Sequence, residues 1–374
     1  MSLLTGKKRN EDERFFQASQ WQLIWWKFRK HKLAMIGSVV VLFLYVLVIF
    51  CEFISPYKTT SRNKKYLYAN PQKLRWVHPT EGFRLRPFVY DMYRETDPKT
   101  YRRYFIEDTD KVIELAFFAR GEPYKFWGIW ESDVHLLGPV DPEAPFFLMG
   151  TDRIGRDVFT RIVYGARISL TIGLIGVFLT FVFGLTIGAV SGFYGGWIDH
   201  IIQRVIDVLI SIPQLPLWMG LAAAVPPDWP PLRVYFGIVV VLSIIGWTGL
   251  ARVVRGKLLS LREEDFVMAA ELAGSNDMRI IFRHLLPSFF SYIIVSLTLS
   301  IPQMILGETS LSFLGLGLRP PVVSWGVLLQ DAQDVGSIAH YPWLLVPVIF
   351  VILTVLAFNF LGDGLRDAAD PYVR

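Results

Sequence analysis

A charged segment between two strongly apolar stretches reads Met268-Ala-Ala-Glu-Leu-Ala-Gly274-Ser-Asn-Asp-Met-Arg-Ile-Ile-Phe-Arg-His284-Leu-Leu-Pro287. Alanine favours helix, whereas a glycine followed by serine and asparagine tends to end one. We expect a second helix to begin near Asn276 or Asp277, because aspartate is favourable at the positive N-terminal end of a helix. The segment therefore predicts a helix–turn–helix with small residues at the bend.

The composition of this segment favours docking onto another protein. Its bend and second helix carry small and apolar residues, namely Ala269, Ala270, Ala273, Gly274, Ile280, Ile281 and Phe282. Such a knob can lie in a groove of a partner, as helix-in-groove recognition requires. The alternative is a solvated charged loop, and the apolar residues argue against it.

The overall composition indicates a membrane protein. The chain has 374 residues, of which 52% are hydrophobic, and its mean hydropathy is +0.38. The lone Cys51 excludes a disulfide framework and a cysteine-based metal site. The net charge of +5 does not indicate nucleic-acid binding, because the basic residues cluster beside apolar stretches. The first apolar run lacks an A-x-A-like cleavage site, so we expect a retained span.

Six stretches are long enough to cross a bilayer, whose hydrocarbon core of about 30 Å needs about 20 apolar residues. They are residues 33–54, 168–192, 208–225, 234–251, 289–306 and 343–361. The third is the weakest, because Pro213 and Pro216 interrupt it, although prolines are tolerated in spans. The sequence therefore predicts an all-α integral membrane protein.

The basic residues predict the orientation. They precede the first span and fill the loop between spans four and five, at Lys27, Arg29, Lys30, Lys32, Arg252, Arg255, Lys257, Arg262, Arg279 and Arg283. Positive charge marks cytoplasmic segments, so both termini and this loop are expected inside. The stretch Trp21-Gln-Leu-Ile-Trp-Trp-Lys-Phe28 predicts an interfacial elbow helix on the inner leaflet. The alternative is an ordinary aromatic belt.

These predictions divide the chain into five parts. They are a cytoplasmic N-terminus with the elbow (1–32), the first span (33–54), an external segment (55–150), a core (151–361) with a cytoplasmic loop at about 252–287, and a cytoplasmic tail (362–374). Alternating patterns at 83–86 and 111–115 predict some β-structure in the external segment. This segment either caps the outer mouth or contacts a substrate-delivery protein. Asp133 and His135 lack a third ligand, so no metal site is expected.

Two patterns concern helix packing around the second span. Small residues recur at four-residue spacing at Gly176, Thr180, Gly184, Gly188 and Gly192. Such a stripe lets another helix approach closely, either within the chain or across a subunit interface. Before the span, the sequence predicts a helix that starts with Thr151 as N-cap and Asp152 in the first turn, paired to Arg156.

Glu308 is an ionisable residue at the end of the fifth span. Such groups are costly at membrane depth and usually face a pore or a partner. Glu308 therefore either lines or gates a route, with Pro302 bending the span, or acts as a structural cap or ion pair. Arg319 is a candidate partner for it, and residues 311–316 are a candidate re-entrant helix.

The charged segment resembles the EAA loop of permease subunits in ABC importers. Five residues match its pattern, namely Ala269, Ala270, Gly274, Leu286 and Pro287. Met268 replaces the usual glutamate and His284 the usual isoleucine, so the ion pairing attributed to that glutamate is not assumed here. Arg283-His284-Leu-Leu-Pro287 resembles the dipeptide and oligopeptide branch. The resemblance implies a coupling loop that includes Glu271 and Ala273.

Five further stretches look like the C-type permease of that branch. They are Gly150-Thr-Asp-Arg-Ile-Gly-Arg-Asp157, Gly192-Phe-Tyr-Gly-Gly-Trp-Ile-Asp199, Gly307-Glu-Thr-Ser-Leu-Ser-Phe-Leu-Gly-Leu-Gly317, Pro320-Pro-Val-Val-Ser-Trp-Gly326 and Asn359-Phe-Leu-Gly-Asp-Gly-Leu-Arg-Asp-Ala-Ala-Asp-Pro371. The resemblance implies a MetI-like fold in a bacterial or archaeal inner membrane. It also implies a second permease, two cytoplasmic ATPase subunits that hold ATP and magnesium, and an external solute-binding protein.

The chain shows no catalytic or nucleotide-binding motif. It has no P-loop, HExxH, CxxC or Gly-x-Ser-x-Gly, so we expect no enzyme activity and no cofactor bound by this chain. The resemblance implies peptide import, with oligosaccharides or nickel as alternative solutes. An ion-coupled secondary transporter is a distant alternative, which would show paired discontinuous helices and intramembrane carboxylates. A membrane sensor is another, which would need a cytoplasmic signalling domain.

Overall fold

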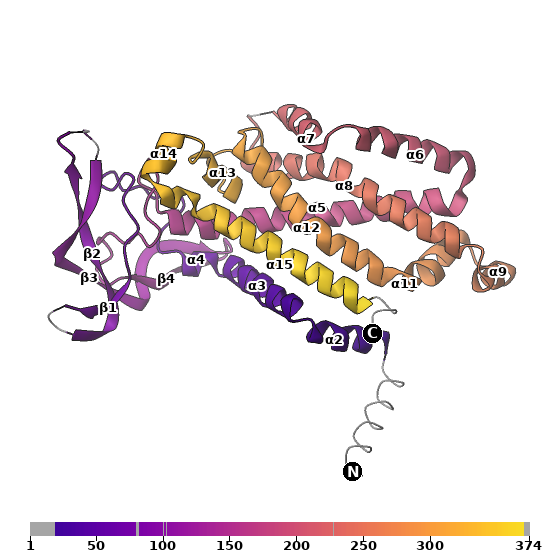
Figure 1. Ribbon diagram of the computed structural model, residues 1–374, viewed down its shortest axis with the longest axis horizontal. Helices are drawn as coiled ribbons and strands as arrows, with labels where there is room; N and C mark the ends of the chain where they lie inside the picture. The colour runs from indigo at the N-terminus through magenta and orange to yellow at the C-terminus, as the bar shows by residue number, and fades with distance from the viewer. Residues whose placement is uncertain (1–18, 80–81, 100, 102, 227, 370–374) are drawn as a thin grey trace, which may run out of the picture.

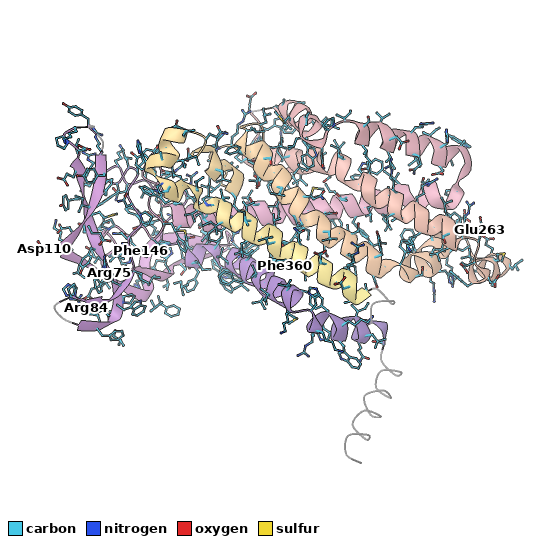
Figure 2. The ribbon with its side chains drawn as sticks, in the orientation of Figure 1. Arg75, Arg84, Asp110, Phe146, Glu263 and Phe360 are labelled. Atoms are coloured by element: carbon cyan, nitrogen blue, oxygen red, sulfur yellow. The ribbon has the colours of Figure 1, made fainter. Side chains whose placement is uncertain are left out.

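A computed structural model describes residues 19–79, 82–99, 101, 103–226 and 228–369. It is mostly helical, with an antiparallel sheet at one end of its long axis and the charged loop at the opposite end (Figure 1). Arg75 and Arg84 mark the sheet end, Glu263 the loop end, and Phe360 lies on a helix between them (Figure 2). Residues 1–18 and 370–374 of the predicted cytoplasmic ends lie outside the described residues.

Five helices are long and apolar enough to cross a membrane, and they correspond to five of the six predicted spans. They are α3 (Lys32–Ile49), α5 (Val158–Tyr194), α8 (Pro231–Leu261), α12 (Phe290–Phe313) and α15 (Val346–Ala369), the last preceded by the 3₁₀ turn η2 (Pro342–Leu345). α5 packs along α8, and α15 packs against α3 and α12. The short α4 (Cys51–Ile54) completes the predicted first span.

The predicted third span, residues 208–225, coincides with a bent pair of helices. The chain forms α6 (Gly196–Ser211) and α7 (Gln214–Ala223), which are bent by 91° and together form either a broken span or a re-entrant loop. Pro213 disfavours helical backbone in the residue before it, and Ile212 is extended. The first of the two prolines therefore ends α6, while Pro216 is accommodated in the first turn of α7.

A separate helix, α2 (Gln20–Lys30), precedes the first span where the elbow is predicted. Ser19 and Gln22 close a capping box at its start. His31 ends it and then caps α3, since its Nδ1 accepts a hydrogen bond from the Ala34 amide at 3.1 Å. Phe28 is buried beside Ala34, whereas Trp25 is exposed.

The predicted β-structure is present and more extensive than the two patterns indicate. The strands are β1 (Arg75–His78), β2 (Gly82–Thr96), β3 (Arg103–Phe126) and β4 (Trp130–Pro139), in the order β1-β2-β3-β4, and each pairs antiparallel to the next. Val89, Ile113 and Leu115 of the sheet pack with Phe146 in an apolar cluster that faces the helical part (Figure 2).

The small-residue stripe of α5 packs against α8 of the same chain. A Cβ on Gly188 would lie 2.6 Å from the Ala251 carbonyl oxygen, and one on Gly192 would lie 2.8 Å from that of Arg255. A Cβ on Gly184 would meet Leu250 at 2.8 Å. The backbones can approach this closely only without a side chain at these positions of α5, so the stripe makes an intrachain interface.

The start of α5 differs from the prediction. Asp157, not Thr151, is the N-cap, and it accepts a hydrogen bond from the Thr160 amide. Thr151 is instead bonded to the backbone of Ala69 and Tyr66. The Asp152–Arg156 pair is confirmed at 2.7 Å.

A third charged residue, not predicted from the sequence, joins that pair. Arg161, which is buried in α5, lies 2.6 Å from Asp152 and 3.6 Å from Asp331. The segment before α5 is therefore not helical and is held in place by these ion pairs. Further short helices are α9 (Asp265–Leu272), α11 (Leu286–Ser288), α13 (Trp325–Gln330) and α14 (Val335–His340).

We predict that Gly188→Ala destabilises the purified chain by about 1–3 kcal/mol, because the added methyl overpacks the contact with Ala251. Thermal unfolding in detergent measures the change. Gly249→Ala is the matched control, since its Cβ meets nothing within 4 Å. Equal unfolding temperatures for the two variants would show that the close contact is not required.

Candidate coupling loop and membrane route

The helix–turn–helix predicted at 268–287 is present. α9 ends at Leu272 with Ala273 as its C-cap, and Gly274 follows with φ +78°. The Ser275 amide donates to the Ala270 carbonyl at 3.0 Å, and the Gly274 amide donates to that of Glu271 at 2.9 Å. These two bonds form a Schellman motif, which needs left-handed backbone at the position of Gly274.

A second helical segment begins where it is predicted. Asn276 caps α10 (Asp277–Arg279) by accepting a hydrogen bond from the Arg279 amide at 2.9 Å. A π-helical turn, η1 (Ile280–Leu285), then leads into α11 and Pro287. The turn and its cap are formed entirely within the loop, so its shape does not depend on a partner.

One face of the loop is anchored to the long helices. Buried side chains of the loop pack with Leu250, Val254 and Leu258 of α8 and Ile293 of α12. The loop residues in this cluster are Val267, Ala270, Ile280, Ile281, Leu285 and Leu286. The loop is therefore packed directly onto α8 and α12.

The other face is exposed and carries apolar side chains. Leu272 is 90% exposed, and Met268, Met278 and Phe282 are also exposed. Among the residues predicted for coupling, Ala270 and Leu286 are buried and His284 is half-buried, while Met268, Ala269, Glu271, Ala273, Gly274, Arg283 and Pro287 are exposed. An exposed apolar tip on a charged loop is the composition expected of a docking surface.

Ion pairs that sequence analysis missed connect α6 to α8 just before this loop. Arg255 contacts both carboxylate oxygens of Asp199 at 2.5 Å, and Arg252 pairs with Asp207. Ser191 of α5 also donates to Asp199. The i, i+3, i+4 spacing of the polar residues on α6 was the available signal, but their partners lie about 50 positions away in sequence.

Glu308 lies inside the helical core, not on a surface. It has no exposed area, and Ser169 of α5, Ser312 and Ser324 donate to its carboxylate at 3.0, 2.8 and 2.6 Å. This position favours the structural alternative over route lining. Arg319 is not its partner, because Arg319 donates to the Gly315 carbonyl.

A related expectation about α12, a separate helix over residues 311–316, is also corrected. α12 includes Pro302 and ends at Phe313. Residues 311–313 therefore belong to its last turn, and residues 311–316 do not form a separate re-entrant helix. Pro302 is buried within the helix.

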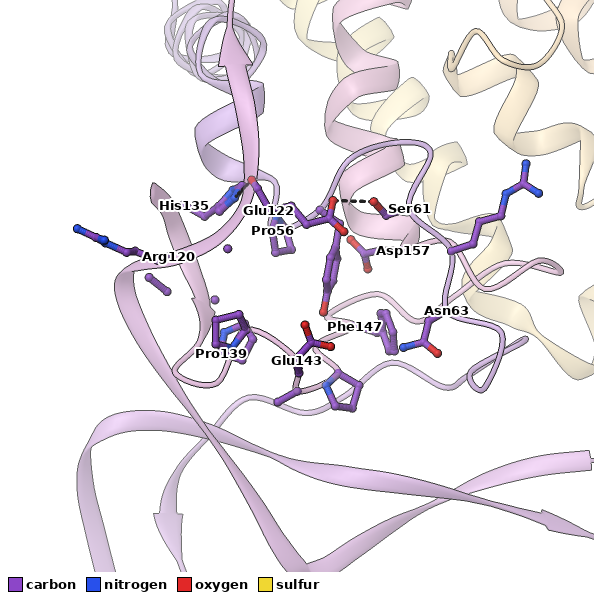
Figure 3. Close-up of a pocket in the computed structure, with 18 of the residues that line it drawn as sticks. Pro56, Ser61, Asn63, Arg120, Glu122, His135, Pro139, Glu143, Phe147 and Asp157 are labelled. Atoms are coloured by element: carbon purple, nitrogen blue, oxygen red, sulfur yellow. Dashed lines mark hydrogen bonds between the residues drawn. The ribbon is translucent and has the colours of Figure 1, made fainter. Parts of the chain in front are cut away.

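A cavity of about 490 Å³ lies in the sheet end, between the segment after α4 and strands β3 and β4 (Figure 3). Glu122, Glu143 and Asp157 face it, and Ser61 donates to Glu122 at 2.6 Å. Burial raises the pKa of Asp157 to about 7. His135 bonds the Glu122 carbonyl, and the described residues contain no group of three metal-ligating side chains.

Comparison with known proteins gives the family. Residues 184–374, just over half of the chain, match the model of the binding-protein-dependent transport system inner membrane component. The chain belongs to this family. Residues 19–71 match the N-terminal transmembrane domain of oligopeptide transport permease C.

Curated relatives agree with this family. The chain is 42% identical over 233 residues to the dipeptide transport system permease protein DppC of Bacillus subtilis, covering 62% of this chain and 71% of that protein. It is 32% identical over 354 residues to DppC of Lactococcus lactis, covering 94% and 91%. An inward-facing structure of the MetNI methionine ABC transporter covers 56% of this chain and 97% of its own, with 20% identity and a TM-score of 0.45.

We predict that Glu308→Ala destabilises the chain by roughly 3 kcal/mol, since it removes the acceptor of three buried hydroxyls and leaves a cavity. Glu308→Gln keeps an acceptor and the side-chain volume, so this variant should lose much less stability. Thermal unfolding of both variants in detergent tests this prediction. Loss of transport in the glutamine variant at normal stability would instead favour a role in the route.

Proposed function

We propose that this chain is one of two permease subunits in an ATP-driven importer of peptides and forms half of the route across the inner membrane. Its membership in the family of binding-protein-dependent transport components supports the class of machine. The relatives named for dipeptide transport support the solute. The observation that carries the proposal is the exposed apolar turn at 268–287, anchored to α8 and α12.

The partners follow from this assignment. A second, homologous permease completes the route, two cytoplasmic subunits bind ATP and magnesium, and an external protein delivers the solute. This chain itself binds no cofactor and catalyses no reaction. The exposed side chains of Met268, Leu272 and Phe282 give an ATPase groove an apolar surface to bind.

The proposed orientation places both termini and the loop in the cytoplasm. α2 and the loop lie at the same end of the long helices, opposite the sheet (Figure 1). Lys27, Arg29 and Lys30 end α2, and Arg252 and Arg255 lie on the last turns of α8. Positive charge at one end of the spans supports a cytoplasmic position for that end.

In this mechanism, closure of the ATPase pair moves the loop, and the loop moves α8. Leu250, Val254 and Leu258 connect the two by packing. α8 then moves α5, against which it packs at the small-residue stripe. It also moves α6, to which the Asp199–Arg255 ion pair joins it. The route alternates in this way between outward-open and inward-open states.

We predict that Gly274→Leu abolishes ATP-driven uptake while the protein still reaches the membrane. A leucine there is strained by the φ of +78° and adds bulk to the docking turn. Peptide uptake into cells or proteoliposomes measures the effect.

Gly82→Leu is the matched control for this substitution. Gly82 has φ +79° and also has nothing within 4 Å of its Cβ, but it lies in the sheet at the opposite end. It should carry a similar backbone strain and retain uptake. Uptake at the wild-type rate in Gly274→Leu would exclude the coupling role.

A second experiment tests the partners and the solute together. Affinity purification of the tagged chain from native membranes in mild detergent, followed by mass spectrometry, should recover a second permease, ATPase subunits and a binding protein carrying peptide. Oligosaccharide or nickel in the binding protein would correct the solute only. A lone chain without ATPase after crosslinking would overturn the proposal in favour of a secondary transporter.

A further inference from the structure

The turn between β3 and β4 carries a tryptophan in an unusual backbone conformation. Trp127 and Gly128 have φ of +51° and +76°, and the Ile129 amide donates to the Phe126 carbonyl at 3.0 Å. Three residues, 127–129, separate the strands. Positive φ at the two central residues of the hydrogen-bonded turn 126–129 is typical of type I′, which favours asparagine and glycine there. A tryptophan at the first position costs about 1–2 kcal/mol.

The strained residue contacts the end of the first span. The Trp127 indole Nε1 donates to the Ile49 carbonyl at 3.0 Å. The Arg167 guanidinium lies 5.0 Å from the centre of its ring, and Glu52 holds this guanidinium with two bonds of 2.7 Å. The turn thus fixes an aromatic ring between α3 and α5, and these contacts offset the strain.

A second aromatic residue in β3 repeats this arrangement. Phe118 has φ +58°, and its ring lies 5.9 Å from that of Phe53 in α4. Phe126 in turn lies 6.0 Å from Phe50. The two non-glycine residues of β3 and its turn that adopt left-handed backbone therefore both lie against the same end of the first span.

Large apolar side chains remain exposed around these contacts. Ile129 is 70% exposed and Trp130 is 65% exposed at the tip, and Phe118 is 67% exposed. Ile49 and Phe50 at the end of α3 are exposed beside them. The apolar surface of the hairpin is therefore continuous with the apolar surface of a membrane-spanning helix.

The position of the tip along α3 matches a bilayer interface. α3 has 18 residues, so it is roughly 27 Å long at a rise of 1.5 Å per residue. Trp25 and Trp26 are exposed just before its first end, and Trp127 contacts its last residue. The hydrocarbon core is about 30 Å thick, and tryptophans gather at both of its interfaces.

We propose that the tip at 126–130 inserts into the lipid interface at the sheet end of the spans and anchors the sheet to the membrane. The occupant of this surface is lipid, because the tip continues a lipid-facing helix at the depth of an aromatic belt. Trp127 positions the tip by fixing it to α3. This anchor goes beyond the proposed function and does not depend on the solute or on the ATPase.

A nitroxide label at the tip tests the proposal. The chain has one cysteine, the buried Cys51, so Ile129→Cys in a Cys51→Ala background gives one labelling site. The full chain in lipid nanodiscs is measured by power-saturation EPR with oxygen and with a water-soluble nickel complex. Leu85→Cys is the matched control, since Leu85 is exposed on β2.

The label at Ile129 should collide several-fold more with oxygen than with the nickel complex, and the label at Leu85 should show the reverse ratio. A water-like ratio at both sites would overturn the anchor. Low accessibility to both reagents at Ile129 would also overturn it, because a protein partner would then cover the tip.

Trp127→Asn separates the anchor from the fold of the hairpin. Asparagine suits the type I′ position, so the turn remains while the ring is lost. The label at Ile129 should then shift toward the water-soluble reagent, with unchanged thermal stability of the chain. An unchanged accessibility ratio would exclude the positioning role of Trp127.

Discussion

The close approach of α5 and α8 is the contact on which the membrane part of this chain depends. Lipid is as apolar as the helices, so burial of apolar surface provides no net attraction and close packing must provide it. The glycines of the stripe let the Ala251 and Arg255 backbones lie against α5. α6 is then held to this pair by charge, through Asp199 and Arg255, and α12 by Ile305 and Met304 against Gly173 and Gly176.

The charged loop continues from the end of α8 and packs against it. Its buried residues belong to the same cluster as the last turns of α8, and its turn is closed by its own backbone. Two demands are met by different residues in one short segment. Ala270 and Leu286 attach the loop, whereas Met268 and Leu272 remain available for docking. Gly274, whose backbone is left-handed, lies at the bend between α9 and α10 and sets the angle between these two segments.

The sequence correctly predicted the features that depend on residues close to one another in the chain. Apolar length located five spans, and the Gly-Ser-Asn sequence located the turn after Ala273. Predictions failed where contacts with residues far away in sequence determine the structure. Pro213 and Pro216 indicated an interruption of the third span but not the size of its bend, because average hydropathy hides one extended residue. Thr151 was misassigned because Ala69 and Tyr66 occupy its side chain. Two of the three serines around Glu308 come from other elements, and Arg319 was proposed as its partner because it is the nearest cation in sequence.

The length of α8 determines how far its two ends move when the helix tilts. Its 31 residues make a rod of roughly 46 Å, longer than the bilayer core of about 30 Å. The glycine stripe lets its turns from Leu250 to Leu258 lie directly against the backbone of α5. A tilt of about 10° about the middle of such a rod displaces each end by roughly 4 Å in opposite directions. In the proposed mechanism, a push on the loop would therefore open one end of the subunit as it closes the other.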